Sequence, residues 1–87
     1  MKRVWKFTLN MADEQIVKMP MGANLLSIQL QGGEMVMWAL VDPLTPNVGH
    51  RMIQCYGTGS GLRSVGQHVA TVQAGSLVYH FFDGGWV

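Results

Sequence analysis

The chain has 87 residues and a mass of 9.6 kDa; 48% of its residues are hydrophobic, 13% are charged, and the net charge is +1. A chain this short can build one hydrophobic core, so we expect a single β-rich domain over residues 1–87. The net charge is too small to draw the chain to nucleic acid or to an acidic membrane surface. Because roughly a quarter of the residues are charged in a typical soluble domain, we expect apolar surface to be covered in a homo-oligomer or by a partner.

Two further features exclude other classes. The single cysteine, Cys55, can form neither an intramolecular disulfide nor a cysteine cluster for zinc, which fits a reducing cytoplasm. The longest unbroken apolar run, Met35–Val41, is much shorter than the roughly 18–20 residues that cross a bilayer. The first residues alternate between polar and apolar, so we expect neither a membrane span nor a signal peptide.

The dominant hydrophobic period along the chain is two, which is typical of half-buried strands. Trp5, Phe7 and Leu9 share one side of a first strand. Residues Gln15–Met19 form a second candidate strand, which a turn at Met19–Gly22 ends. The only place for a turn of helix is Met11–Lys18.

A hairpin is predicted over Asn24–Gln31 and Glu34–Val41, because Gly32 and Gly33 between them can supply the positive φ angles of a tight turn. The second arm is apolar on both faces, so we expect a central strand with Trp38 in the core. Asp42-Pro43 ends it, because proline cannot donate to the ladder.

The remaining chain predicts a loop over Leu44–Gly49 and three more strands: Arg51–Tyr56, Gln67–Gln73 and Ser76–Asp83. The last two form a hairpin about Ala74-Gly75. The predicted fold class is all-β, a small antiparallel sandwich or barrel of about seven short strands.

Several short motifs are spread over most of the chain: Trp5-Lys6, Asp13-Glu14-Gln15, Met19-Pro20, Gly22-Ala23, Trp38-Ala39-Leu40-Val41-Asp42-Pro43, Gly57-Thr58-Gly59 and Val78-Tyr79-His80-Phe81-Phe82. In these motifs the chain resembles a family of small uncharacterised proteins encoded by bacteriophages and prophages. The resemblance implies a phage origin and action in the host cytoplasm, and it implies no reaction. The chain departs from the family pattern at Ser60-Gly61, where His-Pro is expected, and in its tail, Gly84–Val87.

The segment Gly57–Gly66 carries four glycines in ten residues and is the main candidate for ligand binding. Backbone N–H groups of a glycine-rich turn can form a nest for a phosphate, and hydroxyl and guanidinium groups can add donors. The candidate ligand-binding residues are Gly57, Thr58, Gly59, Ser60, Arg63 and Ser64. The alternative is a flexible connector, since the segment has neither a Walker ending nor a dinucleotide fingerprint.

No metal site, cofactor or catalytic set is predicted. With a two-residue turn at Ala74-Gly75, Val69 rather than His68 lies opposite His80, which separates these two histidines. No nucleophile, base and orienting group stand at a specific spacing, so we expect no enzyme activity. Trp86 follows two glycines with no strand to hold it, so it docks on its own domain or on a partner and is a candidate interface residue.

These features favour a small phage-encoded, non-catalytic binding protein. It would block or sequester a host component, either a host protein or a small phosphorylated signal, as an anti-defence protein. The alternatives are a structural or assembly component of a virion, and a protein–protein interaction module.

Overall fold

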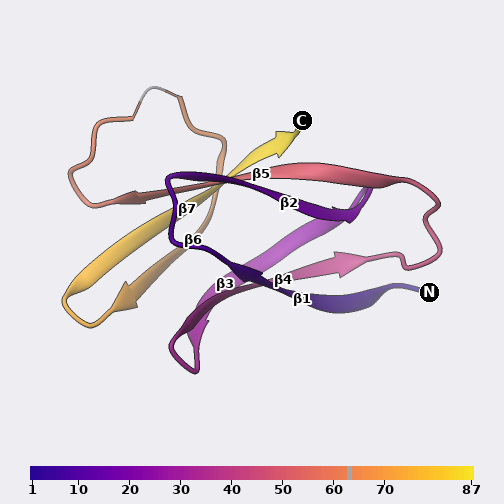
Figure 1. The fold of residues 1–87 in the computed structure, drawn as a ribbon, viewed down its shortest axis with the longest axis horizontal. Coiled ribbons are helices and arrows are strands. Elements are labelled where there is room, and N and C mark those ends of the chain that lie inside the picture. Colours follow the sequence, from indigo (N-terminus) through magenta and orange to yellow (C-terminus); the bar gives the residue numbers. More distant parts are fainter. Residues whose placement is uncertain (63) are drawn as a thin grey trace.

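The computed structural model describes residues 1–62 and 64–87; Arg63 lies outside the described residues. The described residues form strands and contain no helix (Figure 1). The strands are β1 (Arg3–Leu9), β2 (Glu14–Pro20), β3 (Asn24–Gln31), β4 (Glu34–Val41), β5 (Val48–Gly57), β6 (Gln67–Ala74) and β7 (Leu77–Trp86). The all-β prediction is therefore confirmed, and the helical turn considered for Met11–Lys18 is wrong, because that segment enters β2.

The strands form two antiparallel sheets, one in the order β1-β4-β3 and one in the order β2-β5-β7-β6. The predicted hairpin between β3 and β4 is confirmed: Gln31 lies opposite Glu34, and Gly32 and Gly33 have φ angles of 58° and 82°. The edge strands β3 and β6 of the two sheets lie side by side (Figure 1). The sheets therefore come together along one side, and β1 and β2 are the edges at the other ends of the strand order.

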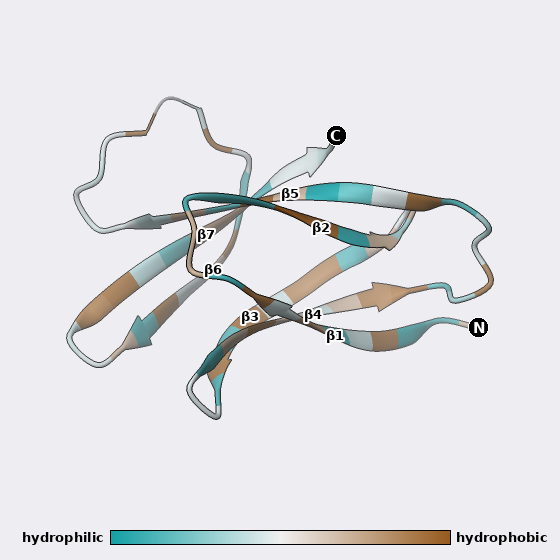
Figure 2. Cartoon of the chain, viewed as in Figure 1, coloured by the Kyte–Doolittle hydropathy of each residue, from teal (hydrophilic) through white to brown (hydrophobic). Residues whose placement is uncertain are grey.

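The core lies between the two sheets. Polar and apolar residues alternate along β1, which appears as alternating bands in Figure 2. The first sheet contributes Met35, Met37, Ala39 and Val41 from its central strand, and the second contributes Ile53, Cys55, Val72 and Phe81. This alternation follows from the pleat, since successive side chains of a strand point to opposite faces.

Trp38 does not lie in this core. The central position of β4 is confirmed, but Trp38 alternates with Met37 and Ala39 and faces away from the second sheet, opposite Lys6 and Ser27. The prediction of a core tryptophan is wrong, because an apolar run cannot reveal which of its two faces the other sheet covers.

The last hairpin also differs from its prediction. Ala74 pairs with Leu77, so the turn is Gly75-Ser76, with Gly75 at a φ of 63°, and not Ala74-Gly75. The glycine occupies the first turn position, where a positive φ angle is needed. The shift by one residue changes every cross-strand pair of the hairpin and places Thr71 opposite His80.

Candidate functional site

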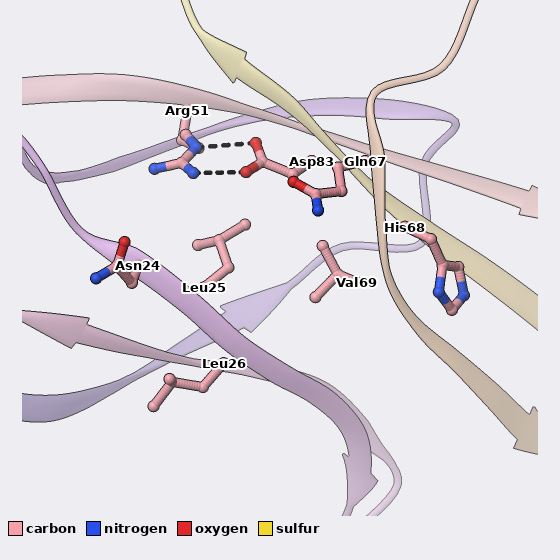
Figure 3. Close-up of a pocket in the computed structure, with 8 residues that line it drawn as sticks. All are labelled: Asn24, Leu25, Leu26, Arg51, Gln67, His68, Val69 and Asp83. Atoms are coloured by element: carbon pink, nitrogen blue, oxygen red, sulfur yellow. Dashed lines mark hydrogen bonds and ion pairs between the residues drawn. The ribbon is translucent and has the colours of Figure 1, made fainter.

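A cleft of about 330 Å³ lies where the edge strands of the two sheets meet (Figure 3). Its lining comes from β3, β5, β6 and β7: Asn24, Leu25, Leu26, Arg51, Gln67, His68, Val69 and Asp83. Leu25 and Val69 face one another across it, and the Arg51–Asp83 pair lies at one end. His68 points away from the other side chains.

Arg51 and Asp83 form a two-point ion pair at the end of the cleft. Arg51 Nε donates to Asp83 Oδ1 at 2.9 Å, and Nη2 donates to Oδ2 at 2.5 Å. Arg51 Nη1 donates to the carbonyl oxygen of Ala23 at 2.9 Å, which links the second sheet to the turn before β3. The side chains of the pair are 11% and 19% exposed. The hydrogen bonds from Arg51 and from the Gly85 amide lower the pKa of Asp83 against the raising effect of burial, so the carboxylate stays ionised.

A β-bulge in β7 creates this arrangement. The register between β5 and β7 shifts where Ile53 pairs with Asp83 and Met52 pairs with Gly85, which leaves Gly84 as the extra residue. Trp86 then lies opposite Arg51, and the Arg51 guanidinium carbon stands 4.4 Å from the centre of the Trp86 ring. The bulge therefore turns both Asp83 and Trp86 toward Arg51.

Two more bulges border the same cleft. The register of β3 shifts around Leu26 and that of β6 shifts around Val69, and both residues line the cleft. β-Bulges concentrate at sheet edges and beside binding sites, where they redirect side chains. The irregular positions of three strands thus converge on one cavity.

The cleft offers hydrogen bonds rather than net charge. Asp83 neutralises Arg51, while Asn24 and Gln67 add amide groups and Leu25 and Val69 add apolar surface. Three of the five N–H donors of Arg51 bind Asp83 and Ala23. Two donors therefore have no partner among the described residues.

Sequence reasoning missed Arg51 and Asp83. The available signal was the alternation of Arg51, Ile53 and Cys55 in one strand, which places the arginine on the inward face with two buried residues. A guanidinium in that position needs a buried acidic partner. The sequence did not reveal which acid, because the bulge at Gly84 decides that Asp83 faces it.

The glycine-rich segment lies over the outer face of the second sheet. Gln54 is 7% exposed beneath it; its Nε2 donates to the Ser64 carbonyl at 3.3 Å, and its Oε1 accepts from the Gly66 amide at 2.9 Å. Ser60 closes a turn onto the carbonyl of Gly57 at 3.2 Å, and Gly59 has a φ of 86°. The described part of this segment is therefore anchored to the sheet at both ends.

Two acidic residues lie beside the candidate phosphate-binding segment. The cavity beside it, of about 450 Å³, is lined by Asp13 and Glu14 together with Gln54, Tyr56, Gly61 and Ser64. Two carboxylates at its lining oppose a phosphate in this cavity by like-charge repulsion; of the predicted ligand-binding residues that the structure describes, only Ser64 lines it. Arg63, the cation of the predicted site, lies outside the described residues, so phosphate binding stays a prediction.

His68 and His80 lie on one face of the second sheet, and the predicted separation of these histidines is wrong. Thr71 Oγ1 lies 2.9 Å from His68 Nε2 and 3.1 Å from His80 Nδ1, and Thr58 Oγ1 lies 2.9 Å from His80 Nε2. The Gly75-Ser76 turn and the bulge at Val69 produce this row. No group of three or more metal-ligating side chains occurs among the described residues.

Trp86 is held by its own chain. The expectation that no strand holds it is wrong, because β7 extends to this residue. Its ring packs against the core and over Gly49, where an added Cβ would lie 2.7 Å from a ring carbon. A contribution of its exposed part to an interface stays a prediction.

Comparison with known proteins assigns the chain to a family. Residues 1–85 match the model of a family described as "Domain of unknown function (DUF7352)". The chain belongs to this family. No curated protein and no solved structure matches the DUF7352 chain. In the described part of this family member, no helix is long and apolar enough to span a membrane.

Proposed function

We propose that the chain is a non-catalytic binding protein that takes a small, neutral, polar molecule into the cleft between β3 and β6. The observation that carries this proposal is the part-buried Arg51–Asp83 pair at the end of a cavity where three β-bulges meet. A volume of about 330 Å³ suits a compact ligand, since small-molecule sites usually span about 300–1,000 Å³.

The chemistry of the lining selects the ligand class. Because Asp83 cancels the charge of Arg51, a charged ligand gains little here, whereas a neutral group can accept from the two uncommitted N–H groups of Arg51. Asn24 and Gln67 can both donate and accept, and Leu25 and Val69 suit a flat apolar part. Amides and nitrogen heterocycles combine these properties.

The biological role belongs to the same proposal. Sequestering a small host molecule in the host cytoplasm would block a host response without catalysis. The support for a phage origin is the motif resemblance over Trp38–Pro43 and Gly57–Gly59. A phosphorylated signal is a less suitable ligand, because the cavity beside the glycine-rich segment contains Asp13 and Glu14.

The test uses ligand-observed NMR with free nucleobases, nucleosides and simple carboxamides as probes. Leu26 is 49% exposed at the cleft, so Leu26→Trp should fill its entrance while disturbing the core little. Leu30→Trp is the matched control, because Leu30 is 44% exposed in the same strand and does not line the cleft. We expect a probe to bind the wild type and Leu30→Trp but not Leu26→Trp. Equal binding to all three chains, or no binding to the wild type, would contradict the proposal.

A second candidate function is that of an assembly or interaction module. A groove of about 250 Å³ between β1 and the β2–β5 pair is lined mainly by apolar side chains, including Trp5, Met19, Pro20 and Val48. Trp5 is 39% exposed and Val48 is 59% exposed, which leaves apolar surface for a partner. Crosslinking of the purified chain to virion proteins would support this function, whereas a failure to associate with any of them would oppose it.

A further inference from the structure

We infer that β2 is the contact between two copies of this chain, paired edge to edge in antiparallel orientation about Ile16. This inference is independent of the proposed ligand site. β2 is one edge of the four-stranded sheet, and the cleft is beside β6, the other edge. Both sites can therefore act in the same dimer.

The hydrogen-bond pattern shows which backbone groups of β2 point outward. The amide of Cys55 donates to the Asp13 carbonyl and the amide of Met21 donates to the Asn47 carbonyl, both at 2.9 Å. In an antiparallel ladder, such pairs alternate with pairs whose N–H and C=O groups point the other way. Following the register from these bonds, the N–H and C=O groups of Glu14, Ile16 and Lys18 point to the free edge.

One register uses all three of these residues. When Ile16 lies opposite Ile16 of a second copy, Glu14 lies opposite the partner's Lys18 and Lys18 opposite the partner's Glu14. Each of these pairs can exchange two backbone hydrogen bonds. A register shifted by two residues in one direction sets Glu14 against Pro20, which has no N–H. A shift in the other direction sets Glu14 against Ile16 and leaves both acids without an opposite charge.

The side chains fit the same register. Glu14, Ile16 and Lys18 are all exposed and share the outer face of the sheet; Ile16 is 48% exposed. Neither Glu14 nor Lys18 has an ion-pair partner among residues 1–62 and 64–87. The pairing would cover two isoleucines between two Glu–Lys pairs, and opposite charges directly across two strands stabilise a ladder.

An exposed strand edge that remains unpaired is an aggregation hazard, and proteins commonly protect such an edge. In β2 the one proline, Pro20, lies at the end of the strand, and the charged residues Glu14 and Lys18 complement one another in the twofold register. The twofold pairing closes this edge with a specific partner and joins the two four-stranded sheets into one. A second copy of this chain therefore complements the edge in three ways: by backbone hydrogen bonds, by Glu14–Lys18 charge pairs and by contact between the two Ile16 side chains.

Charge exchange tests the inference most directly. Glu14→Lys sets like charges opposite each other at both ends of the contact, and so does Lys18→Glu. Each variant alone should dissociate the dimer, with a Kd raised about tenfold or more at low ionic strength. The double variant Glu14→Lys with Lys18→Glu should dimerise again. A mixture of the two single variants should form a heterodimer, because every cross-strand pair is then of opposite charge.

Sedimentation velocity measures these states, and two further variants complete the design. Glu34→Lys makes the same charge change at the exposed first residue of β4, outside β2, and should leave the dimer intact. Ile16→Pro removes an N–H that points away from β5 and to the free edge, so it should give a folded monomer. A monomeric wild type, a dimer that persists in both single variants, or a mixture of single variants that does not associate would overturn the inference.

Discussion

Asp83 and Trp86 are three residues apart in β7, yet both side chains face Arg51 on the inner side of the sheet. In a regular strand, residues three apart point to opposite faces. Because Gly84 is an extra residue in the ladder, Asp83 and Trp86 point to the same face. A Cβ added to Gly84 would lie 2.6 Å from Met52 Cγ, so the bulge position favours glycine. The carboxylate binds the edge of the guanidinium and the indole covers its face, which fixes the end of the cleft.

Asp83→Asn should lower the free energy of unfolding by about 2–3 kcal/mol, because breaking this part-buried pair leaves the Arg51 charge without its counterion. The neutral amide would also turn an N–H group toward the donors of Arg51. Urea denaturation measures the effect. Asp42→Asn is the control: Asp42 accepts a hydrogen bond from the Leu44 amide at 3.0 Å, which an asparagine oxygen can also accept. A difference between the two variants below about 1 kcal/mol would show that the ion pair contributes little to stability.

The lowered pKa of the Asp83 carboxylate makes the free energy of unfolding depend on pH. The hydrogen bonds from Arg51 lower the pKa of Asp83 in the folded chain, so the unfolded chain binds the proton more readily. The stabilising contribution is complete above the unfolded pKa of about 3.9 and is lost as the pH falls through the lower, folded value. The stability difference between wild type and Asp83→Asn should therefore shrink below about pH 4. A constant difference down to the lowest measurable pH would contradict this assignment.

The parts of the fold that follow from local pattern could be predicted, and those that depend on a one-residue shift could not. Alternating segments, one unbroken apolar run and the Gly32-Gly33 turn identified the strands and one hairpin. The turn at Gly75-Ser76 differs by one residue from its prediction, and that shift brings His68, Thr71 and His80 into one row. The cleft depends on bulges, which leave no clear signal in hydrophobic periodicity.

Phe81 and Trp38 lie on different faces of their sheets, and substituting each tests how well its face is covered. Phe81 is fully buried between the sheets, so Phe81→Ala should cost about 3–5 kcal/mol by leaving a cavity. Trp38 is part-buried on an outer face, so Trp38→Ala should cost about 1–2 kcal/mol, since water can fill the space. Chemical denaturation of both variants measures the difference. A larger loss for Trp38→Ala would show that another surface covers that face in solution, and repeating the measurement at several protein concentrations would identify self-association as the cause.

Gly66→Ala should release the glycine-rich segment from the sheet. A Cβ added to Gly66 would overlap the backbone carbonyl oxygen of Asp83, which cannot move without disturbing β7. The shift would also break the hydrogen bond from the Gly66 amide to the buried Gln54 side chain. We expect a loss of about 1–3 kcal/mol, as for other overpacked sites, and faster proteolysis within residues 57–66.

Gly61→Ala is the matched control, because a Cβ added at Gly61 meets no heavy atom within 4 Å. Its stability should stay within about 0.5 kcal/mol of the wild type. If Gly66→Ala and Gly61→Ala are cleaved at the same rate as the wild type, the segment is not anchored through Gly66. If Gly66→Ala alone is cleaved faster, the contact with Asp83 and Gln54 is what holds the segment on the sheet. Because Asp83 also binds Arg51, the same variant should then weaken binding of a probe in the cleft, which ligand-observed NMR would measure.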